Sequence, residues 1–282
     1  MSSGPILPVP TWFVGCGNMG GAIVAGWRVA GVDLSSAVAI RPSGVPVEGL
    51  RTVPTLADAG RAPQLVILGF KPQKLDEIAP QLRTFLTSKT VVVSMLAGVE
   101  AASLRERFPG VAAVVRAMPN LPVAIRRGVV ALYSEDADQA TRQLLSNVFA
   151  SLGYAPWVTD EAKLAAIGSV AGAGPAYVAR FIASLAKAGE KRGLSRELAQ
   201  TVALETVLGT AWMAASFSED MDSVARRVAS PKGTTEAGLA VLDHDEVLEK
   251  LIALTIEAAG RRAAELAEEA KARPLAESAR LS

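Results

Sequence analysis

The order in which two kinds of segment follow one another constrains the fold of this chain most strongly. Between residues 11 and 158, short runs rich in β-branched residues alternate with stretches of helical periodicity, whereas only helical stretches follow Asp160. Such alternation is typical of βαβ units around a mainly parallel sheet. We therefore expect an α/β, doubly wound first domain and an all-helical second domain.

The same patterns place the elements along the chain. The expected strands cover residues 11–14, 38–40, 64–68, 90–94, 111–115, 128–132 and 155–158. The expected helices cover residues 18–30, 72–87, 100–108 and 136–152 in the first domain, and 161–171, 175–192, 196–217, 219–228, 235–243 and 245–271 in the second. Ser195 and Ser218 indicate helix starts, because a serine side chain can cap first-turn amides. The predicted division is 1–159, 160–271 and a disordered tail over 272–282.

Charge and composition exclude several classes of protein. Twenty-nine basic and 28 acidic residues leave a formal net charge of +1, so nucleic-acid binding is not expected. The only cysteine, Cys16, cannot form an internal disulfide, and residues 1–10 lack the pattern of a secretory signal, so we expect a cytoplasmic protein. The only histidine, His244, lies at an apparent turn, which leaves no material for a Ser-His-Asp triad or a multi-histidine metal site.

Apolar content bears on membranes and on assembly. Hydrophobic residues make up 50% of the chain, but the longest apolar runs, such as residues 65–70, are far shorter than the roughly 20 residues that cross a bilayer. No membrane association is therefore expected. Since an isolated domain must cover itself with polar groups, part of the apolar surface is expected to be buried in a homodimer or a ring of dimers.

A glycine-rich turn follows the first expected strand. Gly15, Gly17 and Gly20 form the pattern G-x-G-x-x-G between a strand and a helix, where glycines permit a tight turn and close approach of a pyrophosphate. Free amides and the positive end of the helix then hold the phosphate charge. This predicts a Rossmann-like dinucleotide site, with contacts from Gly15, Cys16, Gly17, Asn18, Met19 and Gly20.

The end of the second expected strand indicates which dinucleotide binds. Proteins that bind NAD place an acidic residue there for the ribose 2′-hydroxyl, but this chain has Arg41 followed by Ser43. A guanidinium can instead grip a 2′-phosphate through two parallel bonds. NADPH is the expected cofactor, and NADH a weaker one.

Five further stretches, in this order, resemble pyrroline-5-carboxylate reductases. They are GFKPQ at 69–73, SMLAGV at 94–99, RAMPN at 116–120, GAGPAYV at 172–178 and SPKGTTEAGL at 230–239, and the resemblance covers about residues 11–265. It implies a dinucleotide-binding domain over 1–159 and a helical substrate and dimerisation domain over 160–271. It also implies cofactor contacts from Gly69, Phe70, Lys71, Pro72, Ala97 and Asn120.

The resemblance implies the reaction as well. The family reduces the C=N bond of 1-pyrroline-5-carboxylate with NADPH and gives L-proline, the last step of proline biosynthesis. Its substrate carboxylate would lie at the loop of Ser230, Gly233 and Thr234, and Thr235 would offer its hydroxyl to the ring nitrogen as the catalytic residue. From the residues alone, amides at a helix start can hold a carboxylate, although the same Ser/Thr cluster could simply cap the helix.

The chain departs from the family pattern at several positions. Lys232 replaces the first of two glycines, which requires that position to tolerate a side chain and adds a positive charge near the carboxylate. Ala173 replaces a serine, Arg126 and Arg127 follow the MPN turn, and no asparagine occurs between residues 42 and 70. These differences bear on substrate range and leave the reaction class unchanged.

Three other functions fit parts of the sequence. A β-hydroxyacid dehydrogenase would need a helical lysine in the stretch GAGPAYVARF, which has none, and Lys163 and Lys187 lie off that spacing and read as solvated helix residues. A broader cyclic imine reductase would be expected to lack the SPKGTT loop. A non-catalytic NADPH-binding protein would not need Thr235.

Overall fold

A computed structural model describes residues 6–271 of the chain. It divides into two compact units. The sheet unit runs to Ala173 and resumes at Ala259, and the helical unit is Gly174–Ala258. The boundary between these compact units lies at 173/174, not at 159/160. The expected domain boundary at 159/160 stays a prediction. The expected disorder of 272–282 lies outside the described residues.

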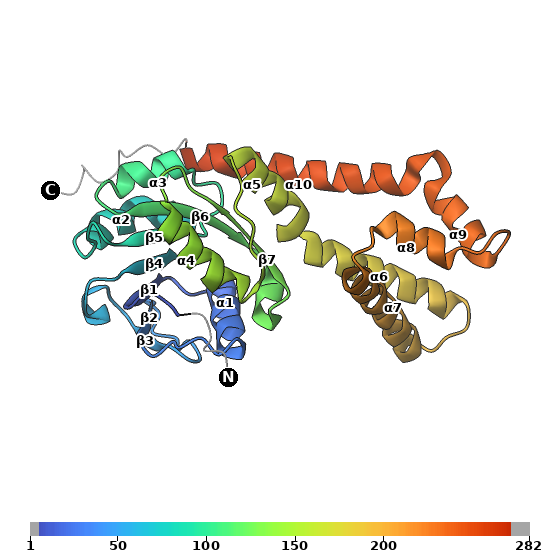
Figure 1. Cartoon of the computed structure of the whole chain (residues 1–282), viewed down its shortest axis with the longest axis horizontal. Coiled ribbons are helices and arrows are strands. Elements are labelled where there is room, and N and C mark those ends of the chain that lie inside the picture. Colours follow the sequence, from blue (N-terminus) through green and yellow to red (C-terminus); the bar gives the residue numbers. More distant parts are fainter. Residues whose placement is uncertain (1–5, 272–282) are drawn as a thin grey trace. The chain divides into compact units, whose positions relative to one another are not determined.

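The sheet unit contains one eight-stranded sheet with strand order β3-β2-β1-β4-β5-β6-β7-β8 (Figure 1). Its strands are β1 (Thr11–Val14), β2 (Ala37–Ile40), β3 (Arg51–Val53), β4 (Leu65–Leu68), β5 (Val91–Ser94), β6 (Ala113–Pro119), β7 (Gly128–Tyr133) and β8 (Gly153–Tyr154). Only the β6–β7 pair is antiparallel. The order reverses beside β1, so the predicted doubly wound, mainly parallel fold is confirmed.

The parallel register places the ends of the central strands in one row. Val14 pairs with both Ile40 and Leu68, and Leu68 pairs with Ser94. The turns that follow β1, β2, β4 and β5 therefore leave the sheet side by side at its carboxyl edge. Ligands of open parallel sheets bind at this edge.

Helices cover both faces of the sheet. They are α1 (Asn18–Val29), α2 (Leu75–Arg83), α3 (Ala101–Arg107), α4 (Gln139–Ala150) and α5 (Glu161–Ile167), with short helices η1 (Ala57–Ala59), η2 (Pro72–Lys74), η3 (Leu121–Ile125) and the π-helix η4 (Gly168–Gly172). Phe13 faces the α1 and α4 side, where its ring lies 5.9 Å from that of Trp27. Trp12 faces the α2 and α3 side with Leu104. This alternation gives the sheet two buried faces.

Three glycines meet at one corner of the sheet unit. A Cβ on Gly26 of α1 would clash with the backbone carbonyl oxygen of Val123, and one on Gly128 would lie 2.6 Å from the nitrogen of Val123. One on Gly153 would lie 2.7 Å from the nitrogen of Gly128. Backbone therefore packs directly on backbone where α1, η3, β7 and β8 converge, and the corner has no room for a side chain.

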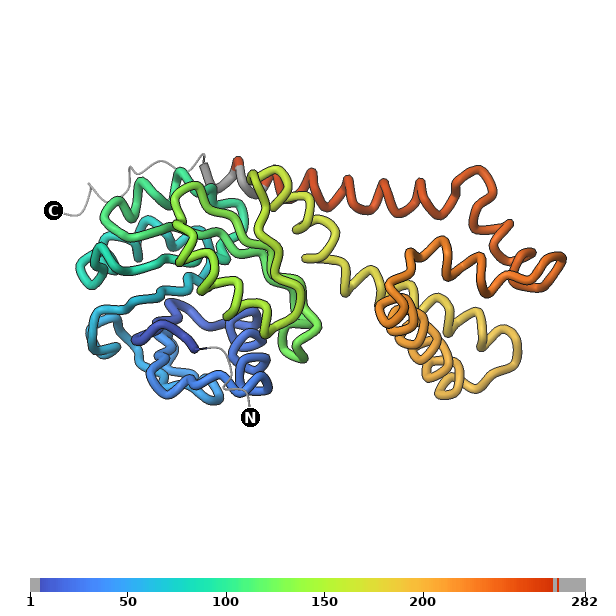
Figure 2. Tube along the Cα trace, viewed as in Figure 1, coloured from blue at the N-terminus to red at the C-terminus, as the bar shows by residue number. Residues whose placement is uncertain are grey.

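The helical unit consists of α6 (Gly174–Lys191), α7 (Arg196–Phe217), α8 (Met221–Val228), α9 (Thr234–Asp243), η5 (His244–Glu246) and the first part of α10 (Val247–Lys271). Figure 2 traces these helices along the chain. The Ser195 hydroxyl accepts a bond from Leu198 at 3.3 Å and starts α7 as predicted. Asp220, not Ser218, caps α8, and its carboxylate accepts from Ser223 at 2.8 Å.

The helical unit buries little of its own apolar surface. The buried apolar side chains of α6 and α7 are small: Ala186, Ala199, Ala203 and Ala214. Large apolar side chains are exposed instead, among them Phe181, Leu208, Trp212, Phe217 and Leu251. Because exposed apolar area of this extent is costly in water, the single chain is incomplete as a folded assembly.

Among residues 6–271, one helical run, Glu161–Lys191, is long and apolar enough to cross a membrane by length and composition alone. Polar and charged residues interrupt this run, so the length of the uninterrupted apolar stretches did not predict it. An apolar helix that packs against another subunit passes the same test, so the run is weak evidence for a membrane span.

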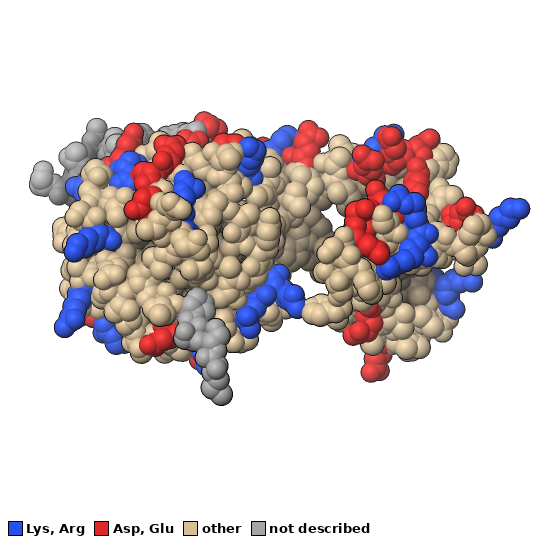
Figure 3. All heavy atoms as spheres, in the orientation of Figure 1, with Lys and Arg blue, Asp and Glu red and all other residues tan. Residues whose placement is uncertain are grey.

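On the face that Figure 3 shows, basic and acidic side chains are interspersed over the sheet unit.

Candidate active site

The glycine-rich turn lies at the carboxyl end of β1. Gly15 has φ +75°, and a Cβ there would lie 2.9 Å from the nitrogen and Cβ of Phe70. Gly17 is the N-cap of α1, and a Cβ there would have no atom of the described residues within 4 Å. The first helical bond runs from the Gly21 amide to the Gly17 carbonyl at 2.8 Å, so the amides of Asn18, Met19 and Gly20 precede it. The turn thus presents amides beside open space, which fits a pyrophosphate.

The turn after β4 packs on the glycine-rich turn. The Gly69 amide donates to the Val14 carbonyl at 2.9 Å, and a Cβ on Gly69 would lie 2.7 Å from the Gly15 carbonyl oxygen. Lys71 is exposed and is the N-cap of η2, with Pro72 at its first position. The structure therefore brings Gly69 and Phe70 next to Gly15, and Lys71 and Pro72 follow in the same turn.

Arg41 begins the turn after β2 and lies on the same side. Its amide donates to Val53 at 2.8 Å, and its Nη1 donates to the Val45 carbonyl at 2.9 Å. This bond fixes the guanidinium while leaving its other N–H groups available. Ser43 lies two residues on, exposed, and its hydroxyl accepts from Val45 at 3.4 Å.

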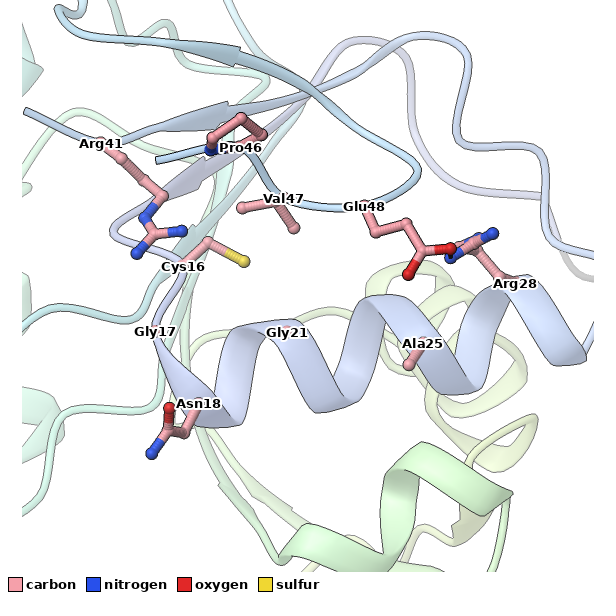
Figure 4. A pocket seen from close by; sticks show the side chains of 10 residues that line it. All are labelled: Cys16, Gly17, Asn18, Gly21, Ala25, Arg28, Arg41, Pro46, Val47 and Glu48. Carbon is pink, nitrogen blue, oxygen red and sulfur yellow. Dashed lines mark ion pairs between the residues drawn. The ribbon is translucent and has the colours of Figure 1, made fainter. Parts of the chain in front are cut away.

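A cavity of about 330 Å³ joins Arg41 to the glycine-rich turn (Figure 4). Burial raises the pKa of the Cys16 thiol to about 11, and the nearby Arg41 charge opposes this in part. Arg28 and Glu48 line the other end of the cavity and form an ion pair of 2.6 Å. No sequence motif predicts that pair, because its members are 20 residues apart, on α1 and on a loop without periodicity.

A second cavity, of about 470 Å³, opens beside the turn after β5. Its walls carry many small residues, including Ala97, which is exposed, and Gly98, which has φ +74°. Arg116 and Glu161 line it too, and their side chains pair at 2.6 Å. Glu161 also accepts from the Ala101 amide at 2.9 Å, so it fixes the start of α3. This pair was not anticipated, since no sequence motif joins its members.

Asn120 is buried and both ends of its amide are engaged. Its Nδ2 donates to the Ala171 carbonyl of η4 at 3.0 Å, and its Oδ1 accepts from the Val129 amide at 2.8 Å. Asn120 therefore ties β7 to the π-helix. The expected contact between Asn120 and the cofactor stays a prediction. The hydrogen bonds show that its side-chain amide holds η4 and β7 in place.

The loop predicted to bind substrate lies in the helical unit, before α9. The Gly233 amide donates to the Ser230 carbonyl at 2.9 Å, so this amide is engaged within the loop. Gly233 is also the N-cap, and no side chain caps the helix. Among the described residues, the hydroxyls of Ser230, Thr234 and Thr235 make no hydrogen bond, and Thr235 is half-buried. The Ser/Thr cluster therefore does not serve as a cap.

Lys232 and Glu236 complete this loop. Lys232 has φ +59°, a left-handed conformation that favours glycine, and its amide donates to Glu236 Oε2 at 2.6 Å. The position thus tolerates a side chain, as the sequence required. The role of Glu236 was not predicted, because it depends on a side-chain conformation.

Within residues 6–271, the side chains that other reaction classes would need do not lie together. His244 is exposed in the turn after α9, where its Nδ1 lies 3.4 Å from Asp245. Lys163 is exposed and pairs with Asp160 at 3.0 Å, and Lys187 is exposed on α6, so both are solvated helix residues as expected. No cluster of three or more metal-ligating side chains occurs within residues 6–271.

Comparison with known proteins identifies relatives over most of the chain. Residues 161–266 match the family model described as pyrroline-5-carboxylate reductase dimerisation. A pyrroline-5-carboxylate reductase of Pseudomonas aeruginosa is 35% identical over 264 residues, which cover 91% of this chain and 96% of the relative. One of Pisum sativum is 32% identical and covers 88% and 93%.

Solved structures agree with the sequence relatives. A pyrroline-5-carboxylate reductase from Coxiella burnetii superposes with a TM-score of 0.85 at 29% identity, covering 92% of this chain and 99% of that one. The Plasmodium falciparum enzyme, solved with NADP bound, has a TM-score of 0.81 at 24% identity and covers 92% and 98%. The predicted resemblance and the predicted enzyme class, an NAD(P)H-dependent oxidoreductase, are confirmed, and the helical region is a dimerisation domain. The chain belongs to the pyrroline-5-carboxylate reductase family.

Proposed function

We propose that this protein is a pyrroline-5-carboxylate reductase that uses NADPH to reduce the C=N bond of 1-pyrroline-5-carboxylate to L-proline. The observation that carries the proposal is the loop before α9, whose hydroxyls at Ser230, Thr234 and Thr235 remain available while the helix is capped by a glycine. A chain that bound only a dinucleotide would have no use for such a loop.

The turns at the carboxyl edge of the sheet hold the cofactor. The amides of the glycine-rich turn, Gly15 to Gly20, receive the pyrophosphate, and Arg41 with Ser43 receives the 2′-phosphate. Lys71, Pro72 and Ala97 border the same edge. Bound NADPH supplies the hydride, which goes to the imine carbon. NADH, which lacks the phosphate, binds more weakly.

The loop before α9 orients the substrate. Ser230 and the amides of Thr234 and Thr235 hold the carboxylate. The Gly233 amide does not take part, because it already donates to the Ser230 carbonyl. Gly233 contributes by allowing close approach. The Thr235 hydroxyl donates a hydrogen bond to the ring nitrogen and passes its proton to it as the carbon gains hydride, and a proton from solvent water restores the hydroxyl. Orientation is the main catalytic contribution, because a protonated imine is already electrophilic.

In this proposal the protein acts in the cytoplasm as a homodimer or a ring of dimers, without membrane or nucleic-acid partners. The exposed apolar side chains of α6 and α7 support burial against a second subunit, and the dimerisation family covers the apolar run Glu161–Lys191. Light scattering at nanomolar concentration checks this assembly. Active monomers would contradict it.

Initial rates of NADPH and NADH oxidation at 340 nm, with the five-membered imino acid, its six-membered homologue and carboxylate-free 1-pyrroline, test the proposed function. We expect turnover with an imino acid and preference for NADPH. Equal efficiency with 1-pyrroline would indicate a broader cyclic imine reductase. Tight NADPH binding without turnover of any imine would indicate a non-catalytic NADPH-binding protein.

Thr235→Ala tests the proton donor. Placing one such donor typically contributes about 10²- to 10⁴-fold, so turnover should fall within that range while NADPH affinity is unchanged. Thr235→Ser should keep most activity. A loss under about threefold would mean that solvent supplies the proton.

A further inference from the structure

Two opposite charges stand at the loop before α9, and the proposed reaction uses neither. Lys232 and Glu236 are both exposed, and the Glu236 carboxylate accepts from the Lys232 amide at 2.6 Å. This bond brings a negative charge into the loop that has to receive a carboxylate. An anion bound there would be repelled by Glu236 unless a cation lies close by.

The neighbouring arginines are already engaged. Arg227 of α8 pairs with Glu219 at 2.7 Å, and Arg226 donates to the Ser223 hydroxyl at 3.0 Å. Within the described chain, the Lys232 ammonium has no ion-pair partner, and it is carried on a flexible four-carbon stem directly beside Gly233. Lys232 is the cation carried by the loop itself, directly before Gly233, and can therefore offset Glu236.

We propose that Lys232 determines substrate specificity by favouring cyclic imines that carry a carboxylate over those that do not. Its charge cancels that of Glu236 and attracts the carboxylate to Ser230 and the first-turn amides of α9. The inference rests on the proposed function, since it names which property of the imine the same loop selects. Its effect is on substrate binding, so it should appear in KM and leave kcat unchanged.

Kinetics of charge variants on the full-length protein test this. At about 20 mM salt, Lys232→Met should raise KM for 1-pyrroline-5-carboxylate by about three- to fivefold, and at about 500 mM salt the increase should fall below about 1.5-fold because salt screens exposed charges. KM for 1-pyrroline should not change at either salt concentration. Lys232→Arg should behave like the unaltered protein.

Glu236→Gln keeps an acceptor for the Lys232 amide but removes the charge. It should lower KM for the carboxylate substrate by about twofold, and in combination with Lys232→Met it should restore a KM close to that of the unaltered protein. Lys89→Met is the matched control, because Lys89 is exposed in the turn before β5, at the amino edge of the sheet and not at its carboxyl edge. It should change neither KM.

Lys232→Gly separates charge from folding. Glycine adopts φ +59° without cost, so this variant should be at least as resistant to heat as the unaltered protein while showing the raised KM. An unchanged KM for Lys232→Met at low salt, or equal changes for both imines, would overturn the inference while the reductase activity stands. If the unaltered protein reduces neither imine, the proposed function fails and the inference fails with it.

Discussion

Two alanine substitutions in the glycine-rich turn should separate cofactor binding from folding. Within the part of the chain that the structure describes, a Cβ on Gly17 would meet nothing within 4 Å, and the residue has φ −83°, which alanine adopts freely. The folded protein should therefore lose at most about 1 kcal/mol, the difference between glycine and alanine as N-caps. If a pyrophosphate occupies that open space, the added methyl group displaces it.

Gly15→Ala should do the reverse and damage the fold itself. Its φ of +75° costs a non-glycine residue about 1–2 kcal/mol, and its Cβ would lie 2.9 Å from the Phe70 backbone nitrogen. Such overpacking typically costs about another 1–3 kcal/mol, so a total loss of about 2–5 kcal/mol is expected. This is a large part of the stability of an ordinary domain.

Thermal unfolding without cofactor and titration of NADPH by fluorescence measure the two effects. Gly15→Ala should lower Tm by about 4–15 °C, whereas Gly17→Ala should lower it by no more than about 4 °C. Gly17→Ala should raise the Kd for NADPH by about ten- to hundredfold, the size of a lost charge-assisted contact. Unaltered NADPH affinity in Gly17→Ala would refute the assignment of the pyrophosphate to this turn. Equal destabilisation by both changes would refute the steric reasoning.

Two further predictions concern the neighbouring side chains. Arg41→Ala should raise KM for NADPH by about ten- to hundredfold and KM for NADH much less, because only NADPH carries the 2′-phosphate. Initial rates with both cofactors measure this, and an equal rise of both KM values would contradict it. Since the folded pKa of Cys16 is raised to about 11, its contribution to stability is complete below the thiol's ordinary pKa of 9.0 and is lost as pH rises toward 11. Unfolding by urea across that range should show the loss, Cys16→Ala should remove it, and rapid alkylation of the native protein at about pH 8 would contradict the burial on which it rests.

Most helices could be predicted from local signals. The expected helix at 196–217 coincides with α7, because Ser195 supplies a side-chain cap and Ser218 ends the helix at φ +53°. The expected helix at 161–171 is in fact α5 followed by a π-helical turn, η4. Nothing in the residue pattern signals that change, because the apolar spacing continues through it.

One strand was missed and one was predicted at the wrong residues, for identifiable reasons. β3, Arg51–Val53, was missed because it is three residues long, pairs only with β2 and is partly exposed, so it shows no continuous apolar run. The expected strand at 155–158 forms only an isolated bridge at Trp157, and the last strand is instead the pair Gly153–Tyr154. Edge pairings depend on the neighbouring strand and are weakly encoded in their own residues.

The candidate site divides in the same way. The turns at Gly15, Arg41, Gly69 and Ala97 could be expected at one edge, since each follows a parallel strand. The pairing of Arg116 with Glu161 and the bond from Lys232 to Glu236 could not, because they depend on side-chain conformations and on contacts between distant residues. For the same reason the sequence could not show that the Gly233 amide is engaged by Ser230.

The corner formed by Gly26, Gly128 and Gly153 has a consequence for reading variant libraries. These glycines should tolerate substitution as poorly as Gly17, although the corner they form is one of backbone packing and they do not line the glycine-rich turn. A growth-based scan would place the corner glycines and Gly17 alike among the intolerant positions, although the first are needed for folding and the second for cofactor binding. Measuring cellular abundance alongside growth should part them: variants of the corner should disappear from the soluble pool, whereas Gly17 variants should persist there as full-length but inactive protein.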